Sequence, residues 1–287
     1  MNKKNKAFSY VMIVLVYLFA LIVGAGIYLS LFESLDMWLS LLIADTGATV
    51  LVFIFSLIFK NASVYDPYWS VAPIFILGLM LIGQAITPFK IALFAVVAIW
   101  GVRLTANWAY CFGDLTCQDW RYTMLKEQTG KFYPIINFVG IHLVPTIVVY
   151  ACILPACYVA TSNQLSENPV AYIFLGVSLL AVILQGTADY QMQKYRKNKT
   201  TPFIRNGLWK YSRHPNYLGE ILMWWGIGGA CAVYNPSMWF LLSGALINTL
   251  LFALVSIPMA EKRQGKKEGF LQYKRETNYL LPFKIKN

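Results

Sequence analysis

The chain has 287 residues, of which 58% are hydrophobic and only 13% are charged. This composition supplies too little polar surface for a soluble globular domain of that length, so the membrane is the expected solvent. The formal net charge of +11 fits the cytoplasmic excess of Lys and Arg in membrane proteins and their attraction to anionic lipids, so no nucleic-acid partner is implied.

Eight apolar segments approach the roughly 20 residues that a helix needs to cross the hydrocarbon layer. The sequence therefore predicts an all-α fold, a polytopic transmembrane bundle of about eight helices, with 1–287 as a single transmembrane domain. The first apolar run is longer than that of a signal peptide, so we expect an uncleaved first span. The predicted spans are 8–31, 40–59, 69–87, 89–110, 134–161, 169–192, 218–234 and 237–259.

Two span boundaries depend on turns marked by proline, at Thr87-Pro88 and at Asn235-Pro236. With both turns in place, the basic loops 111–133 and 193–217 lie on the same face as the lysine-rich N-terminus and the basic tail that starts at Glu261. Lys and Arg gather on the cytoplasmic side, so this count predicts that both termini are cytoplasmic.

Ionisable residues within a span are costly and are functional candidates by default. They are Asp45, Arg103, Asp189 and Glu220, with Asn107, His142 and Gln185 as polar companions. We interpret Asp45 as a solvated helix end and expect His142 to form a hydrogen bond across helices. Arg103 either extends toward headgroups or shares a cytoplasmic pocket with Asp189 and Glu220.

The stretch from Asp189 to Glu220 holds the densest set of polar groups. Pro215 suits the first turn of a helix, where free N–H groups beside Arg213 and His214 form an anion site for phosphate or carboxylate. Asn216 and Glu220 are four residues apart, so they share one helix face. The alternative interpretation is a basic loop that binds lipid headgroups.

Further polar clusters fall on the same predicted face. They are Gln118-Asp119-Trp120-Arg121-Tyr122 and Glu261-Lys262-Arg263. Alone, each would be an ordinary interfacial anchor, but together they add both signs of charge to the mouth of the predicted pocket. The cysteines and histidines do not have the spacing of a metal site, so no metal is expected.

The segment 206–220, Asn-Gly-Leu-Trp-Lys-Tyr-Ser-Arg-His-Pro-Asn-Tyr-Leu-Gly-Glu, resembles the C-terminal signature of the steroid 5-alpha-reductase-like membrane proteins, in particular their bacterial DUF1295 branch. Segments 65–70, 100–104 and 119–122 also resemble that group. The likeness covers roughly residues 60–285. It implies a multi-pass protein of the bacterial inner membrane.

The resemblance implies NADPH as the cofactor, bound by the C-terminal helices without a separate dinucleotide-binding domain. Asp189, Arg196, Asn216, Glu220 and Arg103 match cofactor contacts of the reductases. With the clusters above, the full set of candidate cofactor-binding residues is Arg103, Asn107, Asp119, Arg121, Tyr122, Asp189, Arg196, Asn206, Leu208, Tyr211, Arg213, His214, Asn216, Tyr217, Glu220, Glu261 and Arg263.

The chain departs from the steroid reductases in the groups that polarise the substrate carbonyl. Trp100 stands near the position of the reductase Tyr, and no Glu occupies the second or third predicted span. We therefore expect a replacement acid, for which Tyr65, Asp66 and Tyr68 are the candidates.

The leading functional hypothesis is hydride transfer from NADPH to an activated C=C bond of a lipophilic, steroid-like or enone lipid substrate. Two alternatives stay open. The Arg-His-Pro-x-Tyr-x-Gly element also resembles the isoprenylcysteine and phospholipid methyltransferases, whose cofactor is S-adenosylmethionine. The third class is a non-catalytic lipid-binding membrane protein. Expected partners are the substrate and membrane lipids; no obligate protein partner is inferred.

Overall fold

The protein is built from helices. The computed structural model describes residues 3–162 and 168–282, and within these ranges every regular element is a helix, which confirms the all-α prediction. The elements are α1 (Lys3–Leu31), α2 (Met37–Ile58), η1 (Ala62–Tyr65), α3 (Tyr68–Leu81), α4 (Pro88–Cys111), α5 (Trp120–Thr129), η2 (Gly130–Phe132), α6 (Tyr133–Ile136), η3 (Asn137–Leu143), α7 (Val144–Thr161), α8 (Pro169–Lys197), η4 (Gly207–Lys210), α9 (Pro215–Tyr234), η5 (Pro236–Leu242), α10 (Ser243–Leu251), η6 (Phe252–Ser256), α11 (Ile257–Gln264) and α12 (Phe270–Glu276).

Seven helical stretches in the described residues are long and apolar enough to cross a membrane, so the protein is an integral membrane protein by length and composition. They correspond to seven of the predicted spans. The remaining prediction, 218–234, falls on α9, which has 20 residues. Its glycines, its tryptophans and Glu220 lower its hydropathy, and most of its residues are buried. Its crossing of the membrane stays a prediction.

Both proline-marked turns are present. α3 ends at Leu81 and α4 begins at Pro88, while α9 ends at Tyr234 and η5 begins at Pro236. Proline fits a first helical turn because its missing N–H would have no partner within the helix there. The Asn235 side chain accepts a hydrogen bond from the Ser237 N–H at 3.2 Å, which caps the new helix start.

The chain packs as two compact units, Met1–Ile86 with Val97–Asn163 and Thr87–Val96 with Gln164–Asn287. The single domain predicted for 1–287 stays a prediction. In the first unit α1 packs closely on α2, because a Cβ on Gly24 would lie 3.2 Å from the Ala48 Cβ. Gly101 on α4 similarly lies against the carbonyl oxygen of Ser70 on α3.

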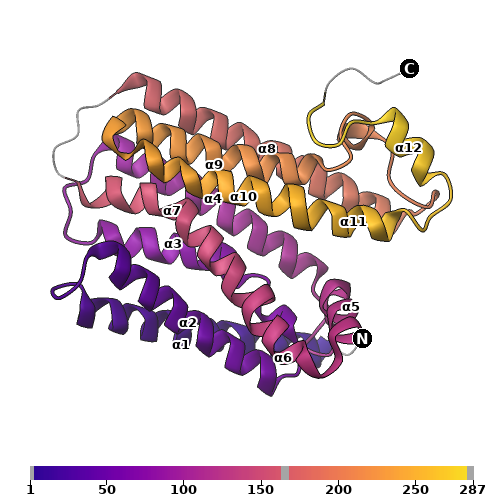
Figure 1. The fold of residues 1–287 in the computed structure, drawn as a ribbon, viewed down its shortest axis with the longest axis horizontal. Coiled ribbons are helices and arrows are strands. Elements are labelled where there is room, and N and C mark those ends of the chain that lie inside the picture. Colours follow the sequence, from indigo (N-terminus) through magenta and orange to yellow (C-terminus); the bar gives the residue numbers. More distant parts are fainter. Residues whose placement is uncertain (1–2, 163–167, 283–287) are drawn as a thin grey trace. The chain divides into compact units, whose positions relative to one another are not determined.

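In the second unit α8 and α9 pack along their lengths, as Figure 1 shows in orange tones. Glycine permits this approach. A Cβ on Gly219 would lie 2.7 Å from the Ala181 carbonyl oxygen, and one on Gly226 would lie 2.8 Å from the Phe174 carbonyl oxygen and closer still to Ser178 Oγ. The missing side chain of Gly226 thus lets α9 approach the backbone of α8.

Gly226→Ala is expected to destabilise the second unit by about 1–3 kcal/mol, because the added methyl group collides with α8 backbone. The measurement is thermal unfolding in detergent. Gly176→Ala on α8 is the matched control, since an added Cβ there meets nothing within 4 Å. Equal melting curves for the two variants would contradict the packing described.

Candidate functional site

Two predicted motifs of the first unit, Tyr-Asp-Pro-Tyr-Trp-Ser and Asp-Trp-Arg-Tyr, are held against each other. The Tyr122 hydroxyl donates to an Asp66 carboxylate oxygen at 2.5 Å, and the Asp119 N–H donates to Ser63 Oγ at 2.8 Å. Asp119 also pairs with the Arg121 guanidinium at 2.8 Å. The chain thus brings together segments that are more than 50 residues apart.

The candidate acids divide between two places. Asp66 pairs with Tyr122, whereas Tyr65 and Tyr68 are fully buried within the helices of the first unit. The Tyr68 hydroxyl donates to Asp45 Oδ1 at 3.3 Å. The interpretation of Asp45 as a solvated helix end is therefore wrong: the residue is 8% exposed and lies two turns inside α2.

Asp45 and Tyr68 line two neighbouring cavities of the first unit and are shared by both. One lies between α2, α3 and α7 and also contains Tyr65 and Thr146. The other lies between α1, α2 and α3 and is lined almost entirely by apolar groups. Each has free space for little more than one water molecule, and the carboxyl and hydroxyl pair is the polar end of this mostly apolar space. The lining of the apolar cavity is Leu21, Gly24, Ala25, Tyr28, Leu41, Ala44, Asp45, Ala48, Tyr68, Ala72, Phe75, Ile76 and Leu79.

Two buried threonines extend the polar contacts of Tyr65, which the sequence did not predict. Thr146 Oγ1 on α7 lies 2.8 Å from the Tyr65 hydroxyl and 2.9 Å from Thr49 Oγ1 on α2. The four-residue spacing of Asp45 and Thr49 could have indicated a polar cluster, because it puts both residues on one face of the second predicted span.

His142 lies in the π-helical turn η3 and is fully buried. Its Nδ1 lies 2.9 Å from the carbonyl oxygen of Asn137, five residues earlier on the same helix. The expected hydrogen bond across helices is therefore replaced by one that the wider π-helical turn makes available. The ring packs on Tyr65, with centroids 4.7 Å apart, and on Phe53.

Arg103 and Asn107 lie one turn apart on α4, in the part of that helix that belongs to the first unit, and both are half-buried. Each makes polar or electrostatic contacts within the protein. Their predicted role as cofactor contacts stays a prediction.

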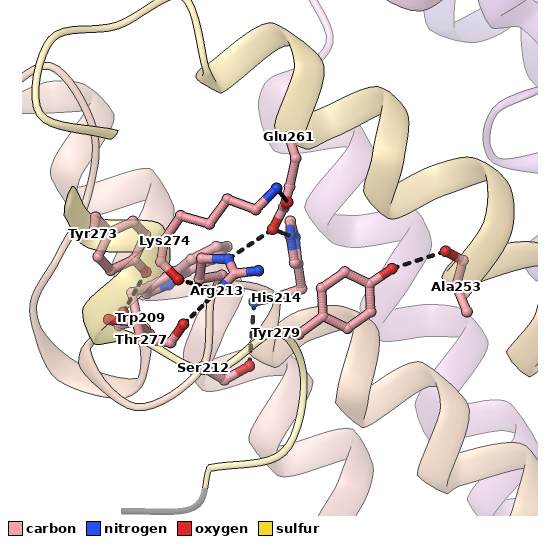
Figure 2. Close-up of polar contacts among 10 residues, drawn as sticks. All are labelled: Trp209, Ser212, Arg213, His214, Ala253, Glu261, Tyr273, Lys274, Thr277 and Tyr279. Carbon is pink, nitrogen blue, oxygen red and sulfur yellow. Dashed lines mark hydrogen bonds and ion pairs between the residues drawn. The ribbon is translucent and has the colours of Figure 1, made fainter. Parts of the chain in front are cut away.

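In the second unit a buried carboxylate, Glu261 on α11, gathers three cationic or titratable side chains (Figure 2). Arg213 Nε donates to Glu261 Oε1 at 2.6 Å, and Lys274 Nζ lies 2.8 Å from Oε2. His214 Nε2 lies 3.4 Å from Oε1. Arg213 and Glu261 are both less than a tenth exposed, so their charges are neutralised inside the protein.

The same arginine fastens the C-terminal segment to the start of α9 (Figure 2). Arg213 Nη1 donates to the carbonyl oxygens of Lys274, at 3.0 Å, and Thr277. The Arg213 N–H donates to the Asn278 carbonyl at 3.0 Å, and the Tyr273 hydroxyl donates to the Trp209 carbonyl at 2.5 Å. The signature sequence therefore serves partly as a docking surface for α12 and the residues after it.

His214 directly precedes α9 and stacks on Tyr217, with centroids 5.4 Å apart. Burial lowers the pKa of His214 below its ordinary value, against the opposing effect of the nearby Glu261. The imidazole is therefore neutral at pH 7 and can act as a hydrogen-bond partner without adding charge.

Glu220 on α9 is 2% exposed, and its carboxylate accepts hydrogen bonds from two side chains. Gln185 Nε2 on α8 donates to one oxygen at 2.7 Å, and Trp224 Nε1 donates to the other at 2.9 Å. Gln185 Oε1 is buried without a hydrogen-bond partner. Asn216 lies one turn before Glu220 and is half-buried, so it can face a ligand at the start of α9.

The remaining predicted cofactor contacts lie on α8, on the loop before α9, and on α11. Asp189 is half-buried, whereas Arg196, Asn206, Tyr211 and Arg263 are exposed. The Leu208 N–H donates to Gln191 Oε1 at 2.9 Å. The preceding residue, Gly207, has a φ of +61°, a backbone conformation that favours glycine. Arg196 and Arg263 are thus exposed, and Arg213 and Lys274 pair with Glu261.

Comparisons with known proteins agree with the resemblance of the motifs. A family model described as "Protein of unknown function (DUF1295)" matches residues 52–277. An uncharacterized protein of Schizosaccharomyces pombe is 26% identical over 247 residues, which cover 75% of this chain and 69% of the relative. No solved structure matches the chain.

Proposed function

Because the chain belongs to the DUF1295 family, whose function is unknown, we propose from its own residues that it is a membrane oxidoreductase that transfers hydride from NADPH to an activated C=C bond. The substrate is lipophilic, a steroid-like or enone lipid. The protein works in the bacterial inner membrane with both termini cytoplasmic.

The observation that supports this proposal is the Asp45–Tyr68 pair at the junction of two cavities in the first unit. An enone reduction develops negative charge on the substrate carbonyl oxygen, and a positioned O–H donor stabilises that charge. Tyr68 supplies the O–H, which would turn from Asp45 Oδ1, 3.3 Å away in this structure, to the substrate carbonyl oxygen. The apolar residues that line the cavity between α1, α2 and α3 favour contact with a hydrocarbon group.

The reaction is balanced in electrons and protons. When bound, NADPH would supply the hydride that the β-carbon of the enone accepts. The C=C electron pair moves toward the carbonyl oxygen, which accepts a hydrogen bond from Tyr68. The α-carbon then takes one proton. In total the C=C bond gains one hydride and one proton and becomes a CH–CH bond. The chain's residues therefore hold the carbonyl and supply the proton.

The second unit offers groups that fit a phosphorylated cofactor. Arg196 and Arg263 are exposed, and Asn216 lies half-buried at the first turn of α9, where free N–H groups favour an anion. The unpartnered Gln185 Oε1 can accept a hydrogen bond from a bound ligand. These residues would hold the phosphates and the polar part of the cofactor.

S-adenosylmethionine fits this set less well. Its sulfonium and ammonium groups need a carboxylate, but Glu261 already has three partners and Glu220 has two donors. Exposed arginines suit phosphates, because guanidinium groups bind them through paired N–H donors.

The direct test is saturable binding of NADPH to the purified full-length protein, followed by the fluorescence of the cofactor, with S-adenosylmethionine as competitor. Asn216→Ala is expected to weaken NADPH binding about tenfold, the loss of about 1.4 kcal/mol of hydrogen bonding. Asn168→Ala, at the far end of α8, is the control and should leave binding unchanged.

The outcomes separate the candidate functions. Displacement of NADPH only by related nucleotides, with NADPH consumed when a lipophilic enone is added, supports the reductase. Binding of S-adenosylmethionine alone would favour the methyltransferase, and binding of neither would favour a non-catalytic lipid-binding role.

A further inference from the structure

The residues that follow α12 in the second unit lie against the residues that lead into α9. We call residues 277–279 the strap. The Arg213 N–H donates to the Asn278 carbonyl at 3.0 Å. One residue further along, the Tyr279 ring meets the His214 ring edge-on, with centroids 6.1 Å apart (Figure 2). His214 is 6% exposed and directly precedes the first turn of α9, so the strap covers the point from which this helix starts.

The end of the strap is anchored to a carbonyl group that lacks a regular donor within its own helix. The Tyr279 hydroxyl donates to the Ala253 carbonyl at 2.8 Å, in the π-helical turn η6 (Figure 2). An α-helix would direct the Ile257 N–H to Ala253, but this N–H donates to Phe252 instead. A π-turn would use the N–H of residue 258, which is Pro258 and has none. Tyr279 thus supplies the hydrogen bond that this helix cannot.

The two ends of the strap are held with unequal strength. At one end Arg213 donates to the Thr277 carbonyl and pairs with Glu261, and both charged side chains are less than a tenth exposed. At the other end the Tyr279 side chain is 39% exposed and is held through its hydroxyl group and its ring. Exposed segments with few contacts open at a lower free-energy cost than buried ones. The strap can therefore lift at Tyr279 while Arg213 and Glu261 stay paired.

We propose that the strap is a gate, with Tyr279 as its latch, that admits a phosphorylated ligand to the first turn of α9. Lifting the strap uncovers His214 and the Tyr217 ring stacked on it, which also packs on Phe252 of the π-turn. An open gate leaves the Ala253 carbonyl without its donor, and this cost favours reclosing. The identity of the ligand rests on the proposed function, but the opening of the gate does not.

Hydrogen exchange of the Arg213 N–H measures the opening, because its acceptor is the Asn278 carbonyl on the strap. The experiment uses the purified full-length protein in detergent without ligand, with residue-resolved mass spectrometry. In Tyr279→Phe we expect about tenfold faster exchange at Arg213, since the ring stays and only the hydrogen bond of the latch is lost. The Leu218 N–H, which donates to the His214 carbonyl within the helix start, is the internal reference and should be unchanged.

Tyr195→Phe is the matched control variant. The Tyr195 hydroxyl also donates to a backbone carbonyl of the second unit, that of Thr201, but it does not contact the strap. Exchange at Arg213 should therefore equal that of the wild type. Equal exchange at Arg213 in Tyr279→Phe and in the wild type overturns the gate. A matching acceleration at Leu218 also overturns it, because the start of α9 would then be fraying as a whole.

A second variant tests the latch without changing the strap. Pro258→Ala gives the helix an additional N–H, so the Ala253 carbonyl gains a helical donor that competes with Tyr279. We expect Tyr279→Phe to accelerate exchange at Arg213 less in the Pro258→Ala background than in the wild type, because both changes act on one interaction. Independent, additive effects of the two substitutions would contradict the role of this carbonyl as the acceptor of the latch.

The kinetics of NADPH binding connect the gate to the proposed function. A gate controls passage in both directions, so Tyr279→Phe should raise the association and dissociation rate constants by the same factor and leave Kd unchanged. Faster dissociation alone would make Tyr279 a binding contact and overturn the gate. A protein that shows the expected exchange at Arg213 but never binds NADPH would retain the gate while the proposed function fails.

Discussion

Tyr68→Phe is expected to lower the rate of enone reduction by about 10²–10³-fold, the usual cost of removing one donor that stabilises a developing oxyanion. The substitution keeps the buried ring and removes only the hydroxyl that donates to Asp45. If the hydrogen bond strengthens only as charge develops, kcat and kcat/KM should fall together. The measurement is steady-state consumption of NADPH with a lipophilic enone in detergent.

Tyr17→Phe is the matched control for this prediction. Tyr17 is also a buried tyrosine, its ring packs on Tyr68 with centroids 5.5 Å apart, and its hydroxyl donates to the Val64 carbonyl at 2.5 Å. It lines neither cavity. Equal losses of activity in the two variants would show that Tyr68 acts through packing alone, which would remove the main support for the proposed acid.

Asp45→Asn refines the same prediction. The amide keeps the size of the side chain and an oxygen that can accept from Tyr68, but it cannot take up or release a proton. A loss as large as that of Tyr68→Phe would indicate that the pair acts as one unit, in which single substitutions are not additive. An active Asp45→Asn variant would limit Asp45 to positioning the Tyr68 hydroxyl.

Most of the fold could be predicted because it depends on local properties of the sequence. A run of about 20 apolar residues forms a helix in lipid whatever surrounds it, since backbone groups must pair within the segment. Pro88 and Pro236 then mark where helices start. The hydropathy of α9 was harder to interpret, because a helix buried by protein on most sides can carry Glu220 and several glycines without exposing them to lipid.

The site could be predicted only in part, because its contacts join residues that are far apart in the sequence. The motifs marked both Asp66 and Tyr122 as candidates, but they did not predict the hydrogen bond between the two residues. The distance of Asp45 from the membrane centre suggested solvent exposure, and only the packing of α1 and α3 around α2 buries it. Likewise, nothing in the sequence around Arg213 indicates that its partner is Glu261, 48 residues later.

Glu261→Gln is expected to destabilise the second unit by about 3–5 kcal/mol, the usual cost of leaving a buried charge without its partner. The Arg213 guanidinium would then remain less than a tenth exposed with only carbonyl acceptors. Because Arg213 also holds the C-terminal segment, we expect α12 to detach before the membrane helices unfold. Limited proteolysis near α12 and thermal labelling of the buried Cys231 thiol report these two events separately.

Glu276→Gln provides the same chemical change in an exposed ion pair. Glu276 lies 2.8 Å from Arg205 Nη2, and both side chains are more than a third exposed, so this pair should contribute about 0–1 kcal/mol. The other four cysteines, Cys111, Cys117, Cys152 and Cys157, are replaced by Ser in both variants so that labelling reports Cys231 alone. Similar melting curves for Glu261→Gln and Glu276→Gln would mean that solvent screens the charges around Glu261, and that Arg213 is free to bind an anion after all.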